Sequence, residues 1–305
     1  MTSKRRLTKP VSTWKILTLP KISDIDSKVP ESSPLLKFLA CEALDKNLFR
    51  GQSRDFKTGQ VYGGQVLGQA IKAAYETLDE ERTIHSAHAY FLRRGDVEAP
   101  IIYEVDRSLD GGSFSSRRVV AIQHGHQIFH LSASFQRQEE GLNFVENDRL
   151  PKEELASALD SKLPRQHDFQ SDYFEAYFLP KEKLTCEHAE QYWMRAKHPL
   201  PDEQACHHSV LAYISDMGLL GAALNPHGLD RASLKKAKQK LILASLDHAI
   251  WFHREFRADE WLFYDCRPQS NSGGRGFAVG KIYSEDGSLV ASTAQEGLMR
   301  LRPQD

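Results

Sequence analysis

The sequence is poor in cysteine, and its four cysteines lie far apart. Cys41, Cys186, Cys206 and Cys266 form no C-x-x-C pair among the 305 residues. This spacing argues against a zinc ribbon, a redox motif and a dense disulfide framework. The sequence also has no His, Cys or Asp cluster with metal-ligand spacing. We therefore expect neither a metal ion nor a redox cofactor.

The chain also lacks an excess of charge and a long apolar run. It has 40 Lys and Arg against 41 Asp and Glu, for a formal net charge of −1. A balance of this kind gives no overall field toward nucleic acid or an anionic membrane. No stretch approaches the ~18 apolar residues that mark a membrane-spanning helix. We expect a soluble protein that does not bind nucleic acid and does not span a membrane.

Several familiar catalytic motifs are missing. The sequence contains no G-x-S-x-G elbow, P-loop, G-x-G-x-x-G or H-E-x-x-H. The nearest approach to a serine elbow is the Gly-Gly-Ser-Phe-Ser run at 111–115. Any chemistry must therefore come from residues that are scattered along the chain.

The order of predicted elements repeats once along the chain. Helical spacing over 63–78 is followed by β-rich runs at 85–91, 101–107, 114–123 and 127–136. A second helical pattern over 207–224 is followed by runs at 241–252, 261–266, 276–283 and 289–295, and 191–196 forms a further short run. Two copies of one helix-plus-sheet unit explain this order, and they indicate the α+β class.

The repeat sets the expected domain limits. We expect a basic and polar N-terminal tail over 1–34, a first domain over 35–140, a charged connection over 141–190 and a second domain over 191–305. Single residues support the repeat, since His88-Ala89 matches His248-Ala249 and SASFQ at 132–136 matches ASTAQ at 291–295. The exposed edges of two such units could be buried against each other.

Longer segments carry a family resemblance. YGGQVLGQAI (62–71), GSFSSRRVVAIQHG (112–125), SLDHAIWFHREFRADEW (245–261) and VASTAQEGLMR (290–300) resemble the type II acyl-CoA thioesterases, from about Leu48 to Arg302. The resemblance implies a double hotdog fold, in which two fused antiparallel sheets each wrap a helix. It also implies hydrolysis of fatty-acyl-CoA to a free fatty acid and coenzyme A, and assembly into a homo-oligomer.

The resemblance assigns three catalytic residues to the second domain. They are Asp216 in ISDMG, Ser245 in SLDH and Gln295 in AQEG. Thioester hydrolysis needs a water molecule that loses a proton as it attacks, and a carboxylate can accept that proton. The hydroxyl and the amide can fix the water without a covalent intermediate. Backbone N–H groups at the start of one of the two hotdog helices could stabilise the negative oxygen.

Other interpretations of these residues stay open from sequence. Asp216 could be a solvated helix residue, and Ser245 and Gln295 could be ordinary polar residues of strands. His248 and His253 lie beside aromatic residues, where histidine is more often structural than catalytic.

Several basic residues are equally ambiguous. The run from Lys235 to Lys240 could be a solvated face or could meet the phosphates of coenzyme A. Arg117 and Arg275 allow both interpretations as well.

Two other functions compete with hydrolysis. A hotdog enoyl-CoA hydratase needs an Asp and a His at a short fixed spacing around Asn-Pro. Asn225-Pro226-His227 suggests this motif, but Asp216 lies nine residues before Asn225, which is too far. A non-catalytic acyl-CoA-binding protein would be expected to lack one of the three catalytic residues, and all three are present.

The compartment is predicted from the two ends and from the family. The family implies peroxisomes or the cytoplasm, although the C-terminus Arg302-Pro303-Gln304-Asp305 is not an S-K-L type signal. Residues 1–23 contain six Lys or Arg and no acid, which offers a mitochondrial transit peptide as the alternative.

Overall fold

The computed structural model describes residues 33–78, 81–144, 150–160, 172–229 and 241–302. Residues 1–32 of the expected tail and the basic run from Lys235 to Lys240 lie outside the described residues. No helix among the described residues is long and apolar enough to cross a membrane.

Over its described residues, the first half contains two helices and six strands. In chain order these are α2 (Pro34–Leu39), β1 (Glu42–Asp45), β2 (Leu48–Gly51), α3 (Gly63–Tyr75), β3 (Arg82–Phe91), β4 (Ile101–Asp110), β5 (Phe114–Gln123) and β6 (His126–Arg137). Helix α4 (Lys152–Asp160) follows this half.

The second half has the same kinds of element with additional short segments. In chain order these are β7 (Phe174–Phe178), the 3-10 turn η1 (Lys181–Lys183), β8 (Glu190–Ala196), α5 (Gln204–Ser215), α6 (Leu219–Leu224), the 3-10 turn η2 (Asn225–His227), β9 (Leu241–Ser245), β10 (Asp247–Phe252), β11 (Leu262–Ser272), β12 (Arg275–Ser284) and β13 (Leu289–Leu301).

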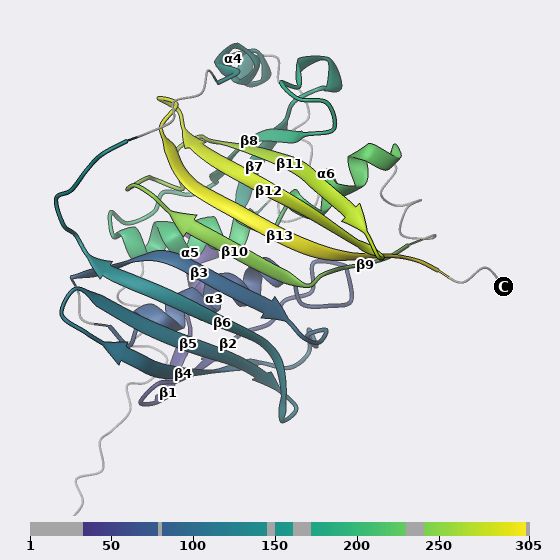
Figure 1. Ribbon diagram of the computed structural model, residues 1–305. Coiled ribbons are helices and arrows are strands. Elements are labelled where there is room, and N and C mark those ends of the chain that lie inside the picture. The colour runs from purple at the N-terminus through teal and green to yellow at the C-terminus, as the bar shows by residue number, and fades with distance from the viewer. Residues whose placement is uncertain (1–32, 79–80, 145–149, 161–171, 230–240, 303–305) are drawn as a thin grey trace, which may run out of the picture.

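All strands join one continuous antiparallel sheet. From the centre outward the first half runs β3-β6-β5-β4-β2-β1 and the second half runs β10-β13-β12-β11-β8-β7. The two halves join where β3 pairs with β10, with Ala89 opposite His248 (Figure 1). Each half thus has the same strand order around its own central helix, which confirms the predicted double hotdog fold of the α+β class.

Strand β7 lies inside the segment 141–190, which the sequence suggests as a connection. It pairs with β8 and occupies the sheet position that β1 holds in the first half. Helix α4 covers the outer face of the second half, because its Leu155 packs with Trp193 and Phe263. The sequence pattern misses β7 because charged residues and prolines dominate the surrounding segment.

The predicted single helix over 207–224 is wrong. The structure has two helices, α5 and α6, separated by a turn at Asp216, Met217 and Gly218. Gly218 has φ 108°, a conformation that side-chain-bearing residues rarely adopt and that ends the helical path. The break places Asp216 at the end of α5, where its side chain can leave the helix surface.

The predicted strand over 241–252 is interrupted at Leu246. Ala249 lies opposite Ala294 and Ser245 lies opposite Gly297, so four steps along this strand match three along β13. The extra residue forms a β-bulge, a feature that redirects neighbouring side chains. Asp247 Oδ1 accepts the Glu296 N–H at 2.7 Å beside the bulge.

The residue-level match between the two halves is also partly wrong. His248 is 1% exposed and faces the helices, whereas His88 is exposed. In the sheet His248 lies opposite Ala89, and His88 lies opposite Ala249. Ala89 therefore takes the inward position beside His248. The repeat holds for the order of elements and fails at this residue.

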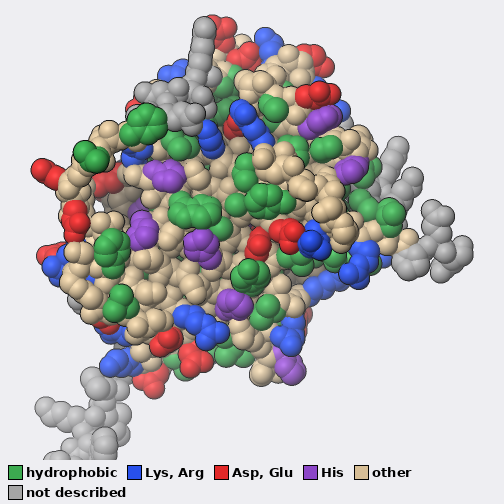
Figure 2. Space-filling view, in the orientation of Figure 1, with side chains coloured by type: hydrophobic (Ala, Val, Ile, Leu, Met, Phe, Trp, Pro, Cys, Tyr) green, Lys and Arg blue, Asp and Glu red, His purple; other side chains and the backbone are tan. Residues whose placement is uncertain are grey.

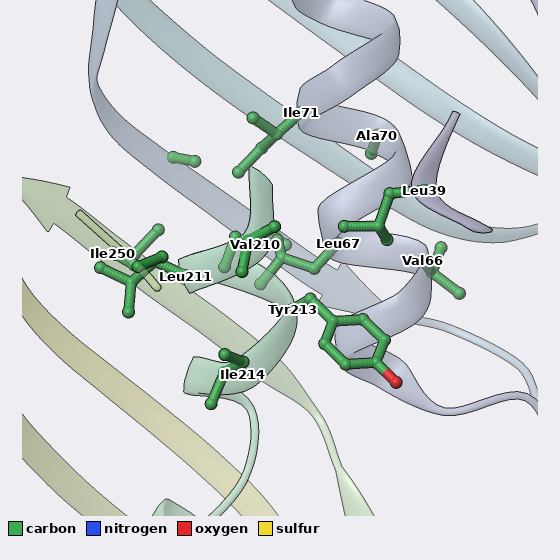
Figure 3. Close-up of a cluster of buried hydrophobic side chains, with 14 of the residues drawn as sticks. Leu39, Val66, Leu67, Ala70, Ile71, Val210, Leu211, Tyr213, Ile214 and Ile250 are labelled. Carbon is green, nitrogen blue, oxygen red and sulfur yellow. The ribbon is translucent and has the colours of Figure 1, made fainter. Parts of the chain in front are cut away.

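The core lies where α3 and α5 cross on the concave side of the sheet. Val66, Leu67, Val210, Leu211 and other apolar side chains fill this contact (Figure 3). Helix α3 is buried on nearly all sides, which is typical of a helix enclosed by a sheet and a second helix. Figure 2 shows the other side, where histidines and hydrophobic side chains lie among uncharged polar side chains and backbone, and most charges lie toward the rim.

Two glycines let α3 and α5 approach closely. A Cβ placed on Gly64 would lie 2.2 Å from the Tyr213 carbonyl oxygen, and one on Gly68 would lie 3.0 Å from that of Ser209. The backbone cannot yield as a flexible side chain can. The small residues of the predicted helix therefore set the distance between the two helices.

We predict that Gly64→Ala destabilises the fold. Its methyl group would overlap the backbone of α5, and overpacking of this kind costs about 1–3 kcal/mol. The melting temperature should fall by several degrees. Gly112→Ala is the matched control, because a Cβ there has nothing within 4 Å. Equal melting temperatures for the two variants would contradict the tight helix contact.

Candidate active site

Asp216 lies between the end of α5 and the beginning of α3. It follows the last residue of α5, and the Gly64 backbone N–H donates a hydrogen bond to its carboxylate. A Cβ on Gly63 would lie 2.7 Å from Asp216 Oδ2, so only glycine leaves room for the carboxylate there. The beginning of a helix favours a negative group, because its free N–H groups and the helix dipole point toward it.

The other two predicted residues contact this carboxylate. Gln295 Nε2 donates to Asp216 Oδ1 at 2.6 Å and to Ser245 Oγ at 3.1 Å. Ser245 Oγ lies 3.5 Å from Asp216 Oδ1, at the outer limit of a hydrogen bond. The structure thus brings together all three residues that the sequence predicts.

The sheet geometry explains how these side chains meet. Ser245 ends β9 directly before the bulge at Leu246, and Gln295 lies on the inward face of β13. Gln295 uses its amide hydrogens on Asp216 and Ser245, and its buried Oε1 has no partner among the described residues. This oxygen is an acceptor that a water or substrate donor could satisfy.

Burial controls the charge of Asp216. Desolvation raises its pKa from 3.8 to about 6, while hydrogen bonds from Gln295, Gly64 and Ser245 act in the opposite direction. No neighbouring charge is among the causes. The group is mostly ionised at neutral pH, yet its pKa is close enough to that pH for it to accept and return a proton.

The two histidines that attract attention in the sequence do not bind Asp216. His248 is buried, its Nε2 lies 3.0 Å from Ser215 Oγ, and burial lowers its pKa to about 3. It is therefore uncharged at neutral pH. His253 contacts Ser292 Oγ at 2.8 Å through its Nε2.

The remaining candidates from the sequence lie apart from the three residues. Buried Arg117 donates to Thr77 at 2.8 Å, and Arg275 pairs with Glu296 at 2.8 Å. Residues 225–227 form η2, where His227 contacts Asn271. The structure therefore gives the Asn-Pro-His motif no contact with Asp216.

Sequence reasoning missed the surroundings of Asp216. Gly63 and Gly64 mark the beginning of a helix in sequence, but nothing there indicates that they face a carboxylate from the other half. Tyr192 and Tyr264 bond the backbone on either side of Asp216, and no sequence motif marks them. The adjacent glycines Gly63 and Gly64 are the one feature of the sequence that could have indicated a close approach at this position.

Two cavities lie away from Asp216, Ser245 and Gln295. The larger, of about 650 Å³, is lined by residues between β7 and β8 together with Asn225 and Gly228. The smaller, of about 520 Å³, lies beside Phe256 and Trp261. Over the described ranges, no group of three or more His, Cys, Asp or Glu side chains could hold a metal ion.

Known proteins match both halves of the chain. A family profile described as acyl-CoA thioesterase matches residues 165–298, and a profile described as acyl-CoA thioesterase N-terminal domain matches residues 52–136. The first match contains Asp216, Ser245 and Gln295, and the second contains Gly63 and Gly64.

Individual relatives match over nearly the whole chain. Acyl-CoA thioesterase 2 of Haemophilus influenzae is 37% identical over 289 residues, which cover 87% of this chain and 96% of that protein. Acyl-coenzyme A thioesterase 8 of Homo sapiens is 35% identical over 290 residues, which cover 87% and 88%. The crystal structure of acyl-CoA thioesterase II TesB2 from Mycobacterium marinum has a TM-score of 0.74 and 38% identity, and covers 89% of this chain and 98% of that one. This chain therefore belongs to the acyl-CoA thioesterase family.

Proposed function

We propose that this protein hydrolyses acyl-CoA thioesters to a free acid and coenzyme A, with a water molecule activated by Asp216. The observation that carries the proposal is the half-buried, desolvated Asp216 carboxylate, held by Gln295, Ser245 and the Gly64 N–H. Membership of the family supplies the substrate class, and a fatty-acyl chain fits that class. Oε1 of Gln295 supplies a further acceptor beside the carboxylate.

The reaction uses these groups in two steps. The water oxygen attacks the thioester carbonyl carbon while Asp216 takes one of its protons, which gives a tetrahedral intermediate. The carbonyl then reforms, the carbon–sulfur bond breaks, and the proton on Asp216 returns to the leaving thiolate. Ser245 and Gln295 hold the water in line for the attack, so that positioning contributes part of the rate.

The beginning of α3 is the better candidate for stabilising the negative oxygen. Of the two central helices, α3 is the one whose N-terminus faces Asp216, because α5 ends at that residue. Its Gly64 N–H already serves the carboxylate. We therefore assign the oxyanion role to the same helix end, which begins at Gly63.

The competing functions receive less support. A hydratase needs a histidine beside the catalytic carboxylate, whereas His248 contacts Ser215 and His227 contacts Asn271. A purely binding protein does not need a carboxylate kept in a desolvated position, which lowers stability at neutral pH. Assembly into a homo-oligomer and a peroxisomal or cytoplasmic location stay predictions.

The first prediction is that Asp216→Asn loses hydrolysis. Free thiol released from short, medium and long saturated acyl-CoAs should fall by about 10²-fold or more in kcat, because the general base is removed. Circular dichroism should show an unchanged fold. Wild-type rates in the variant would overturn the mechanism. Absence of release by the wild type, with hydration of trans-2-enoyl-CoA, would favour the hydratase.

A second prediction separates the hydroxyl of Ser245 from its size. Ser245→Thr keeps the hydroxyl that lies between Asp216 and Gln295, so it should retain most of the activity. Ser245→Val has nearly the same volume as threonine and lacks that group, so its kcat should fall clearly below that of the threonine variant. Equal kcat values for the two variants would remove the hydroxyl from the mechanism.

A third prediction concerns pH. The kcat of the wild type should rise as pH increases through about 6, because only the ionised form of Asp216 accepts a proton.

Burial raises this pKa on folding, so the wild type loses stability as pH rises from about 4 to 6 and the charge becomes buried. The amide of the Asp216→Asn variant has no charge to bury. This variant should therefore melt at a higher temperature than the wild type at pH 7.5, and the difference should shrink as pH falls below about 6 and nearly vanish only below the unfolded pKa of 3.8; a difference independent of pH would contradict the raised pKa.

A further inference from the structure

The turn that carries Asp216 is bonded to the sheet on both sides of that residue. Tyr264 on β11 donates its hydroxyl proton to the Ser215 carbonyl oxygen at 3.0 Å. Tyr192 on β8 donates to the carbonyl oxygen of Met217. These carbonyls belong to the end of α5, where intrahelical partners are lacking. The sheet thus holds the residue before Asp216 and the residue after it.

The direction of each bond at Tyr264 can be assigned. Tyr264 is fully buried, and its hydroxyl also lies 2.8 Å from Thr293 Oγ1. Because its single proton goes to Ser215, the Thr293 hydroxyl must be the donor in that second contact. The pKa of Tyr264 is raised well above its usual value by burial, so the hydroxyl keeps its proton.

The side chain of Ser215 is fixed as well. Its hydroxyl donates to the Ala212 carbonyl at 2.9 Å, so it can only accept from His248 Nε2 at 3.0 Å. His248 must therefore carry its proton on Nε2. Burial keeps the ring uncharged, since it lowers the pKa to about 3. Strands β8, β10 and β11 each supply one bond to this turn.

Two glycines make these contacts possible. A Cβ on Gly280 would lie 2.4 Å from the Tyr264 ring and 2.5 Å from Thr293 Oγ1. A Cβ on Gly218 would lie 2.8 Å from the Tyr192 hydroxyl oxygen, and its φ of 108° turns the chain there. The absence of a side chain at Gly280 and Gly218 thus leaves room for the two tyrosines at the turn.

The bonds to the flanking residues add to the hydrogen bonds that Gln295, Ser245 and the Gly64 N–H make to the carboxylate itself. Desolvation disfavours the charged form, and the Asp216 side chain is only partly buried. A turn that was free to shift would let the carboxylate rotate toward solvent. Three bonds to the flanking residues oppose that movement.

We propose that Tyr264 is a positioning residue for Asp216, supported by Tyr192 and His248, and that it holds the 215–218 turn so that the carboxylate stays at the beginning of α3. The inference rests on the proposed function and goes beyond it. It assigns a role in the reaction to Tyr264, Tyr192 and His248. Their hydrogen bonds to the turn go to Ser215 and Met217, the residues on either side of Asp216.

The surroundings of Asp216 make the pH profile a direct readout of this role. Among the described residues, the titratable side chains near the turn are Tyr62 directly before α3, Tyr192 from β8, His248 from β10, and Tyr264 and Cys266 from β11; Glu190 of β8 lies next to Gly221 in α6. Asp247 and Glu296 alternate with inward residues and so point to the other side of the sheet. The pKa of Asp216 is set by burial and by its own hydrogen bonds, not by these groups.

Tyr264→Phe tests the proposal, because it removes the hydroxyl and keeps the ring. Its kcat should fall by about 10- to 100-fold, with little change in KM, since small displacements of a catalytic group cost this much. The acid limb of its kcat profile should move from about pH 6 toward the ordinary aspartate value of about 4, as the carboxylate reaches water. Should this variant fail to fold, Tyr192→Phe tests the same turn from β8.

Tyr103→Phe is the matched control. Tyr103 is fully buried on β4, which holds the position of β11 in the first half, and its hydroxyl donates to Gln69 Oε1 at 2.7 Å. It should lose a comparable amount of stability but keep the wild-type kcat and acid limb. If Tyr264→Phe behaves like this control while Asp216→Asn is inactive, the positioning role is overturned and the proposed function stands. An active Asp216→Asn would overturn the proposed function itself.

Discussion

The contact between the beginning of α3 and the end of α5 determines how the two halves form one site. The Gly64 N–H of the first half donates to the Asp216 carboxylate of the second, and a side chain on Gly63 or Gly64 would separate them. The carboxylate gains the favourable end of a helix dipole there, although burial works against its charge. Neither half alone contains both partners. Fusion of the two units in one chain keeps them together at every protein concentration.

The continuous sheet converts this contact into a fixed geometry. Its central strands β3 and β10 join the halves, and the inward side of the second half supplies Gln295 and, at a bulge, Ser245. The antiparallel pairing of β9 and β10 with β13 brings together residues that are 50 positions apart in sequence. Backbone hydrogen bonds of the sheet and close packing therefore set the distances between the site residues. Among the described residues, no group of side chains could hold a metal ion that would fix them instead.

The sequence could predict the residues of the candidate site better than its shape. Asp216, Ser245 and Gln295 follow from the family resemblance, and the element order follows from hydrophobic periodicity. The break after α5 depends on Gly218 and on tyrosines from distant strands, and the bulge at Leu246 depends on a register difference with β13. Such features arise from tertiary contacts, so a local pattern does not contain them.

The fold repeats, but the proposed general base lies at one end of the helix pair only. Glu76 caps α3 as Asp216 caps α5, yet it is 46% exposed and pairs with Lys72 at 2.8 Å. Water and a cation therefore stabilise that carboxylate, whereas desolvation acts on Asp216. The two carboxylates therefore differ in solvation, and in the proposed mechanism this difference assigns the general base to Asp216. The turn from Ser215 to Gly218, with its bonds to the sheet, holds Asp216 in its desolvated position.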